Sequence, residues 1–156
     1  MMDRPTRNCY RVCIQVAVEL LEPLKECFDK DEEMDFLDNL AEGLAKSDDA
    51  FEIGVVMHNC GSYISEFFVI DLVKADVYKV RKRVHEELLQ WWLLTQKPCH
   101  KIGDIFQKPF FGSYNRYNVL TNRHVVREIN YQQGKYVFED KTQVDWELAN
   151  TWTMVL

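Results

Sequence analysis

The strongest constraint on the fold is the residue pattern between positions 10 and 19. Large apolar side chains occupy every second position there, and most of them are β-branched. A period of two with β-branched residues predicts a strand with one buried face. A helix is the rival interpretation, because Val12, Val16 and Leu20 also recur every four residues. Pro23 favours a break soon afterwards, with a helix beginning near it.

The next segments predict a helix, a β-hairpin and a second helix. Residues 29–46 carry apolar side chains at spacings of three and four, with acidic residues at the start, where they favour the positive end of a helix dipole. Residues 51–58 and 63–73 are apolar runs on either side of the glycine-containing turn 59–62, which predicts a hairpin. A clear apolar stripe then predicts a helix over residues 75–95. Its members are Val77, Val80, Val84, Leu88 and Trp91.

This order of elements, β-α-β-β-α, is most of a ferredoxin-like unit and covers the N-terminal two-thirds of the chain. A right-handed crossover would place both helices on one face of an antiparallel sheet. Residues 124–131 and 135–139 flank a glycine turn, and alternation resumes over residues 144–156, which predicts a β-meander. We therefore expect an α+β fold, with one compact domain over residues 1–156.

Residues 97–118 show no regular period and contain prolines, glycines and many aromatic residues. They predict a long aromatic-rich loop or arm, and long loops in compact domains are often functional. In the preceding helix, Trp91 fits the apolar stripe, whereas Trp92 lies about 100° further round and is expected to be more exposed. The residues expected to contact a partner are Trp92, Phe106, Phe110, Phe111, Tyr114 and Tyr117.

Composition narrows the setting in which the chain works. Hydrophobic residues make up 47% of it and aromatic residues 13%, which excludes an intrinsically disordered protein. No apolar run reaches the length of about 18–20 residues needed to span a membrane, and the first residues lack the layout of a signal peptide. Five cysteines at loose spacing argue against a disulfide framework. We expect an intracellular protein of the cytoplasm, or alternatively the nucleus, without a membrane partner.

Charge is distributed unevenly along the chain. The formal net charge is −6, but residues 1–73 hold 16 acidic and six basic residues, whereas residues 74–127 hold four acidic and 11 basic ones. Basic residues interleaved with aromatic ones can contact phosphates and stack on bases. The alternative is a solvated helix face that balances the acidic half. The candidate nucleic-acid contacts are Lys79, Lys82, Arg83 and Arg116.

Three chemical patterns test whether the chain is an enzyme. Residues 119–126 resemble the histidine segment of trypsin-like serine proteases, which implies His124 as a general base, but no serine follows Ser113 to complete a triad. Zinc-type ligands occur at His58, Cys60, Cys99 and His100, without the spacing of compact zinc sites. An enzyme site assembled from distant residues would use these four together with His85 and His124.

No catalytic set is complete within the sequence. The aromatic and basic loop offers anchors of the kind that interfaces use. We therefore predict a non-enzymatic protein–protein interaction module, such as a small accessory, inhibitor or adaptor protein. Its expected partner is another protein, or a second copy of the chain, and no cofactor is expected unless zinc binds. A nucleic-acid-binding or nucleic-acid-processing module and an enzyme of distant His and Cys residues are the alternatives.

Overall fold

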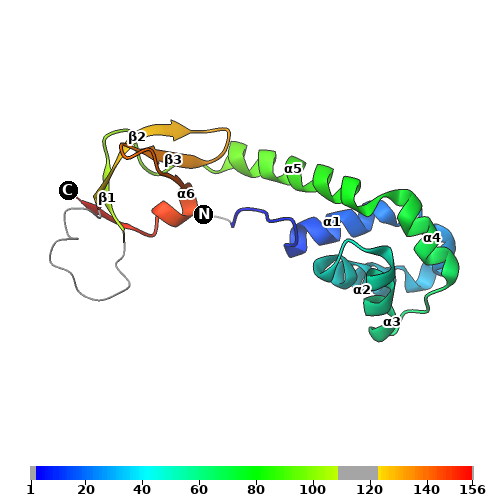
Figure 1. Ribbon diagram of the computed structural model, residues 1–156. Helices are drawn as coiled ribbons and strands as arrows, with labels where there is room; N and C mark the ends of the chain where they lie inside the picture. The colour runs from blue at the N-terminus through cyan, green and yellow to red at the C-terminus, as the bar shows by residue number, and fades with distance from the viewer. Residues whose placement is uncertain (1–2, 109–122, 156) are drawn as a thin grey trace. The chain divides into compact units, whose positions relative to one another are not determined.

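The computed structural model describes residues 3–108 and 123–155, which divide into two compact units. Residues 5–90 form the first, called here the helical unit. Residues 3–4, 91–108 and 123–155 form the second, called here the sheet unit. Together they confirm a mixed helix and strand protein with an antiparallel sheet (Figure 1). The single domain expected over residues 1–156 stays a prediction.

The helical unit contains helices throughout, and none of residues 5–90 forms a strand. α5 begins in this unit, and its last residues, 91–95, belong to the sheet unit. None of the helices in the described part of the chain combines the length and apolar character needed to cross a bilayer. The elements are α1 (Tyr10–Leu20), the 3₁₀ helices η1 (Lys25–Cys27) and η2 (Lys30–Glu32), α2 (Glu33–Lys46), α3 (Ala50–Asn59), α4 (Glu66–Ala75) and α5 (Val77–Thr95).

The strand predicted over residues 10–19 is wrong, because this segment is the helix α1. Val12, Val16 and Leu20 are buried in the core, whereas Tyr10 and Val18 are exposed. The period of four therefore decided the local structure, and the alternation of period two was incidental. Tertiary burial of one helix face outweighs the strand preference of β-branched residues.

The hairpin predicted over residues 51–73 is also wrong, since α3 and α4 occupy it. Asp49 begins α3 as its N-cap, and its carboxylate accepts a hydrogen bond from the backbone N–H of Glu52 at 3.0 Å. Gly43 lets α2 approach α3 closely, because a Cβ there would lie 2.9 Å from Ile53 Cγ2. With three expected strands replaced by helices, the ferredoxin-like order is absent from residues 5–90.

The two helices expected in this half are confirmed as α2 and α5. α2 buries Phe36, Leu40 and Leu44 against the core that it shares with α1 and α3. Acidic residues in its first turn, Glu33 and Asp35, complement the positive end of the helix dipole.

The sheet unit holds five antiparallel strands in the order β4-β3-β2-β1-β5. The strands expected over residues 124–131 and 135–139 are confirmed as β2 and β3. The expected strand from residue 144 is only partly present, because after three residues the chain forms the helical turn α6 and buries Trp146 and Ala149 on one side. The elements are β1 (Ile105–Gln107), β2 (Arg123–Asn130), β3 (Lys135–Phe138), β4 (Gln143–Asp145), α6 (Trp146–Ala149) and β5 (Thr153–Val155).

The segment expected to be a loop over residues 97–118 contains β1, which pairs with both β2 and β5. Phe106 on this strand lies opposite His124 and is buried in the sheet core. The rest of the expected arm, residues 109–118, lies outside the described residues. Residues 105–107 are thus a paired strand within the segment expected to be a loop, and the role of this segment as an arm stays a prediction.

Gly134 makes the turn between β2 and β3 possible. Its φ of +63° is a left-handed conformation, and a Cβ there would lie 2.7 Å from a guanidinium nitrogen of Arg4 and 2.8 Å from Leu93 Cδ2. The glycine thus allows Arg4 to donate to the Gly134 carbonyl at 2.8 Å. This close packing fixes the hairpin against the residues that cover it.

Candidate functional site

A groove with a volume of about 900 Å³ opens on the helical unit. One side is formed by residues 26–39, which run from η1 into α2. The other side is the turn between α3 and α4, residues 60–65. Asn39 on α2 donates a hydrogen bond to Ser62 Oγ at 2.7 Å, which ties the two sides together. The groove is therefore held by a packed scaffold and a polar cross-link.

Aromatic rings line part of this groove. Phe28 and Phe36 are stacked with 4.5 Å between their ring centroids, and Phe36 in turn packs edge-on against Phe68 in the core. Tyr63, from the opposite side, is 86% exposed. The groove thus combines rings fixed by the core with one tyrosine that is open to solvent. Such rings offer apolar area and electron-rich faces to a ligand.

The charge around the groove is entirely negative. No lysine, arginine or histidine lines it, and among the described residues its carboxylates take part in no ion pair. The same described residues contain no group of three or more His, Cys, Asp or Glu side chains placed to hold a metal ion. The carboxylates are therefore spread along the groove instead of converging on one point. They are Glu26, Asp29, Glu32, Asp35 and Asp38.

Two cysteines line the groove, and neither sits in an activating environment. Cys27 Sγ lies 3.7 Å from Asp71 Oδ2 on α4. Burial, and then the neighbouring carboxylate, raise the pKa of Cys27 to about 11. Cys27 therefore stays a thiol at neutral pH and is a poor nucleophile. Cys60 is exposed at the C-terminal cap of α3, with no cation of the groove beside it.

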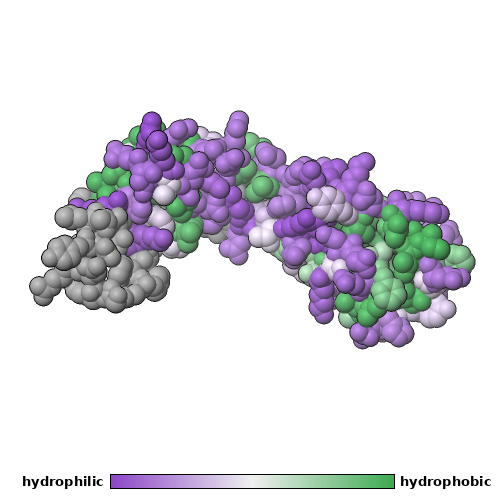
Figure 2. Space-filling view, viewed as in Figure 1, coloured by the Kyte–Doolittle hydropathy of each residue, from purple (hydrophilic) through white to green (hydrophobic). Residues whose placement is uncertain are grey.

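α4 presents an apolar face to solvent, called here the α4 face. Phe67, Ile70 and Val73 are 64%, 49% and 65% exposed, whereas Phe68 and Leu72 on the other side of the helix are buried. Figure 2 shows hydrophobic residues gathered over α4 and α3 on the surface of the helical unit. Exposed apolar residues that cluster in this way mark interaction surfaces more often than singly scattered ones do.

The α4 face adjoins the groove. Ser65, the N-cap of α4, lines the groove, and the contact between Cys27 and Asp71 joins the groove wall to the second turn of α4. Sequence reasoning missed this surface because it treated residues 63–73 as a strand. The signal was present, since Phe68 and Leu72 are spaced for a buried helical face while Phe67, Ile70 and Val73 fall on the opposite side.

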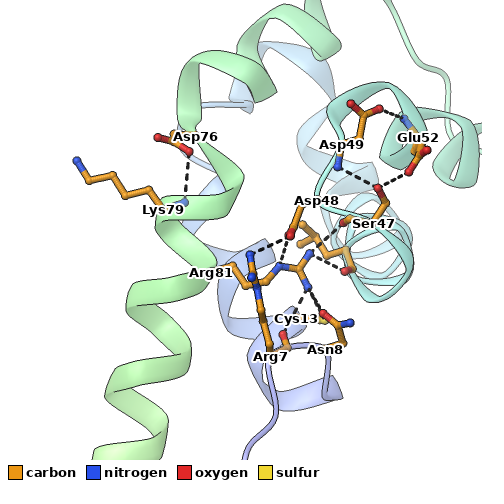
Figure 3. Close-up of polar contacts among 11 residues, drawn as sticks. Arg7, Asn8, Cys13, Ser47, Asp48, Asp49, Glu52, Asp76, Lys79 and Arg81 are labelled. Carbon is orange, nitrogen blue, oxygen red and sulfur yellow. Dashed lines mark hydrogen bonds and ion pairs between the residues drawn. The ribbon is translucent and has the colours of Figure 1, made fainter.

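A fully buried arginine organises the core of the helical unit (Figure 3). Arg81 on α5 pairs with Asp48 at 2.7 Å and donates to the carbonyl oxygens of Leu44 at 2.5 Å and Ser47 at 3.0 Å. It also donates to Asn8 Oδ1 at 3.1 Å. One side chain therefore caps the end of α2, holds the α2–α3 turn and anchors the segment before α1. Because both terminal nitrogens of the guanidinium donate hydrogen bonds within the unit and Nε lies against Asp48, we assign Arg81 a structural role.

The predicted basic surface is smaller in the structure than in the sequence. Arg81 is buried, and Arg83 pairs with both Glu19 and Glu87. These ion pairs raise the pKa of Arg83 above its usual value. Lys79 and Lys82 are exposed on α5. Of the four candidate nucleic-acid contacts, the last, Arg116, lies outside the described residues.

The predicted partner contacts differ from expectation in their exposure. Trp92 is fully buried and Trp91 is 44% exposed, which reverses the expected order. Trp92 packs on Trp146 with 6.4 Å between ring centroids, in the sheet core that also buries Phe106. At this point α5 presents the face that carries Trp92, and not the face that carries Trp91, to the sheet core. The other four candidates, Phe110, Phe111, Tyr114 and Tyr117, lie outside the described residues.

The four candidate zinc ligands divide between the two units. His58 and Cys60 are exposed at the end of α3 in the helical unit. In the sheet unit, Cys99 Sγ lies 3.8 Å from Asn150 Nδ2, and His100 Nδ1 lies 3.5 Å from Asp104 Oδ2. Within the described part of the chain, neither pair belongs to a group of three or more side chains placed to hold a metal ion. Neither pair therefore forms, within its own unit and among these residues, the tetrahedral set that zinc prefers.

The remaining histidines have structural neighbours. His85 Nε2 lies 3.0 Å from the carbonyl oxygen of Pro5, and His124 Nδ1 lies 3.3 Å from Asp140 Oδ2. Hydrogen bonds from Thr142, and then His124, hold the pKa of Asp140 below its usual value. Over residues 3–108 and 123–155, no serine or cysteine is hydrogen-bonded to a histidine. A nucleophile–base pair, which acyl transfer requires, is thus not formed by these residues.

No protein-family model matches the chain, and no curated protein or solved structure matches it significantly.

Proposed function

We propose that the protein is a protein–protein interaction module and that the helical unit carries its contact surface. The observation that carries this proposal is the α4 face, where Phe67, Ile70 and Val73 remain exposed. Exposing large apolar side chains is costly, at about 25 cal/mol for each Å² that could be buried. A helix that already buries Phe68 and Leu72 does not need these three for its own fold. A partner that covers them would recover that free energy.

The chemistry of the described residues supports a binding role over a catalytic one. The groove contains two cysteines, of which one has a raised pKa, and no histidine. Catalytic sites instead bring a nucleophile within reach of a base whose pKa is tuned to its task. All five cysteines are free thiols, which supports a reducing intracellular setting for this binding protein.

A second copy of the chain fits this surface poorly. In a two-fold symmetric dimer, the same patch occurs on both subunits. The α4 face adjoins a groove with five carboxylates and no basic residue. Two such grooves brought together would repel each other, because like charges across an interface are costly. The surface therefore favours a different protein as the partner.

The experiment is affinity capture from source cells with quantitative mass spectrometry. Phe67→Ser and Val73→Ser together should abolish capture of the partner that the wild-type chain recovers. The matched control, Ile102→Ser with Leu148→Ser, removes two comparably exposed apolar side chains from the sheet unit and should retain it. Circular dichroism checks that both variants fold. If the α4 variant folds and captures the same proteins as the wild type, the proposal is wrong.

A further inference from the structure

We infer that the groove beside α4 binds a basic segment of the partner protein, one in which lysine or arginine residues alternate with apolar ones. This inference rests on the proposed function and specifies the chemistry of the partner. The charge of the groove, the distribution of that charge and the rings that line it support this assignment.

Charge sets the sign of the ligand. Five carboxylates surround a space of about 900 Å³, and no basic side chain lines it. In the described residues, these carboxylates have no internal counter-ion. A cleft of one sign attracts ligands of the other sign and speeds their encounter. Nucleic acid would be repelled from this groove, and a cationic ligand would be drawn to it.

The spacing of the charge determines the form of the cation. Glu26 lies within η1 and Asp29 at the N-cap of η2, whereas Asp35 and Asp38 lie one turn apart on α2. These residues form no group of three able to hold a metal ion. A compact ion could therefore neutralise only part of the groove. An extended chain with several separate positive charges can match carboxylates that are spread along both segments.

The aromatic rings that line the groove favour a peptide with apolar side chains over a simple polycation as the ligand. Phe28 and Phe36 provide an apolar wall, and the exposed ring of Tyr63 faces solvent on the opposite side. Arginine and lysine bind over such rings, a geometry that this chain itself uses where Arg7 lies 4.4 Å above the Tyr78 ring. Beyond the groove, the exposed side chains of the α4 face would be buried by apolar residues of the partner. A segment with both basic and apolar residues satisfies the two surfaces together.

The test uses a fluorescein-labelled synthetic peptide of about 15 residues in which arginine and leucine alternate along an extended chain. Fluorescence anisotropy with the full chain should show binding that weakens as salt is raised. A peptide with glutamate in place of each arginine should not bind. Spermine, which carries positive charge but no apolar side chains, should compete only weakly. Equal binding of the acidic peptide, or spermine that competes as well as the unlabelled peptide, would overturn the inference.

Matched variants distinguish binding in the groove from nonspecific attraction to the acidic surface of the protein. Glu26→Gln, Asp29→Asn and Asp38→Asn together should weaken peptide binding about tenfold, because three exposed ion pairs of modest strength are lost. Glu86→Gln, Glu128→Gln and Glu139→Gln make the same charge change at exposed positions outside the groove and should change it less than about twofold. An equal loss in both triple variants would show nonspecific attraction and overturn the inference.

The same groove variant distinguishes the two proposals in the capture experiment. If capture of the partner requires Phe67 and Val73 but survives the groove substitutions, the groove inference is wrong and the proposed function stands. If neither set of substitutions affects capture, the proposed function is wrong as well. Loss of capture with both sets supports both proposals.

Discussion

The two units of this protein use their aromatic residues in opposite ways. Among the described residues, the sheet unit buries most of its rings in one cluster, in which Phe106 contacts Tyr136, Phe138 and Trp152. Its exposed rings in this part of the chain are Trp91 and Tyr131. The helical unit builds its core mainly from aliphatic side chains and leaves several rings exposed. These exposed rings are Tyr10, Phe51, Tyr63, Phe67 and Tyr78. The difference teaches that most of the described rings of the sheet unit serve stability, whereas those of the helical unit exceed what its fold requires.

Each unit is also held by one arginine, and the two arginines differ in environment. Arg81 is fully buried, whereas the Arg4 side chain in the sheet unit is partly exposed. Arg4 pairs with Glu147 at 2.7 Å and lies 4.7 Å above the Trp92 ring. Both donate hydrogen bonds to backbone carbonyls: Arg81 at the end of α2, and Arg4 in the turn between β2 and β3. The buried one should matter more, because water cannot replace its hydrogen bonds.

The largest expected effect therefore comes from Arg81→Ala. The substitution leaves the carbonyls of Leu44 and Ser47 without their donor and opens a cavity in the core. We expect a loss of about 3–5 kcal/mol in the free energy of unfolding, measured by urea denaturation followed by circular dichroism.

Arg83→Ala is the matched control for this substitution. Arg83 lies two residues further along α5 and makes exposed ion pairs with Glu19 and Glu87. Its removal should leave the denaturation midpoint almost unchanged. Similar midpoints for the two variants would show that Arg81 is not the organising contact that its burial indicates.

A slightly smaller effect is expected at the adjacent pair Trp91 and Trp92, which tests the aromatic comparison directly. Trp92→Ala removes a buried ring from the sheet core and should cost about 3–4 kcal/mol. Trp91→Ala removes a half-exposed ring of the same type and should cost less than about 1 kcal/mol. Thermal unfolding of both variants measures the difference. Equal losses would contradict the inward orientation of Trp92.

The same pair shows what the sequence could and could not predict. Period analysis correctly located α5, but it assigned the core position to Trp91 from the apolar stripe of the helix. The stripe describes the face that packs within the helical unit. Near residue 91 the helix passes into the sheet unit, where a different set of residues decides which ring is buried. A boundary between cores leaves no mark on helical periodicity.

The errors in the first half have a related cause. Residues 10–19 satisfy periods of two and of four, and only the presence of neighbouring helices selects the helix. The groove depends on tertiary placement even more, since residues 26–39 and 60–65 are far apart in the chain. Its carboxylates were visible as an acidic stretch, but their relation to Tyr63 was not. Local signals thus predicted α2, α5, β2 and β3, and non-local packing decided the site.

A third test uses pH to probe the sheet core. Tyr136 is buried and donates a hydrogen bond to Asn150 Oδ1 at 3.0 Å. Burial raises the pKa of Tyr136 to about 12, above the value of about 10 expected in the unfolded chain. Because the folded state favours the neutral phenol, this contribution to stability is complete below pH 10. It is lost as pH rises through 12.

We therefore expect the free energy of unfolding to fall between about pH 10 and pH 12, by an amount on the order of 2 kcal/mol. Urea denaturation at several pH values measures this fall. Tyr136→Phe should lose about 1 kcal/mol at neutral pH with its hydrogen bond and should show a flatter alkaline decline. An alkaline decline of the same slope in this variant would assign the effect to another group.

The smallest effect concerns the reactivity of the two thiols in the groove. Cys27 lies on the side that packs against the core, and Cys60 lies on the exposed side. Cys27 has a pKa raised to about 11, so only about one thiol in a thousand is ionised at pH 8. Cys60, on the opposite side of the groove, is exposed. In variants that retain one of the two cysteines, Cys60 should react with a disulfide reagent about a hundredfold faster or more. Asp71→Asn should speed the reaction of Cys27 modestly, because it removes a neighbouring carboxylate that raises the thiol pKa. Equal rates for Cys27 and Cys60 would mean that the side of the groove formed by Phe28 and Phe36 opens in solution. The fixed aromatic wall, on which the proposed peptide binding depends, would then be absent.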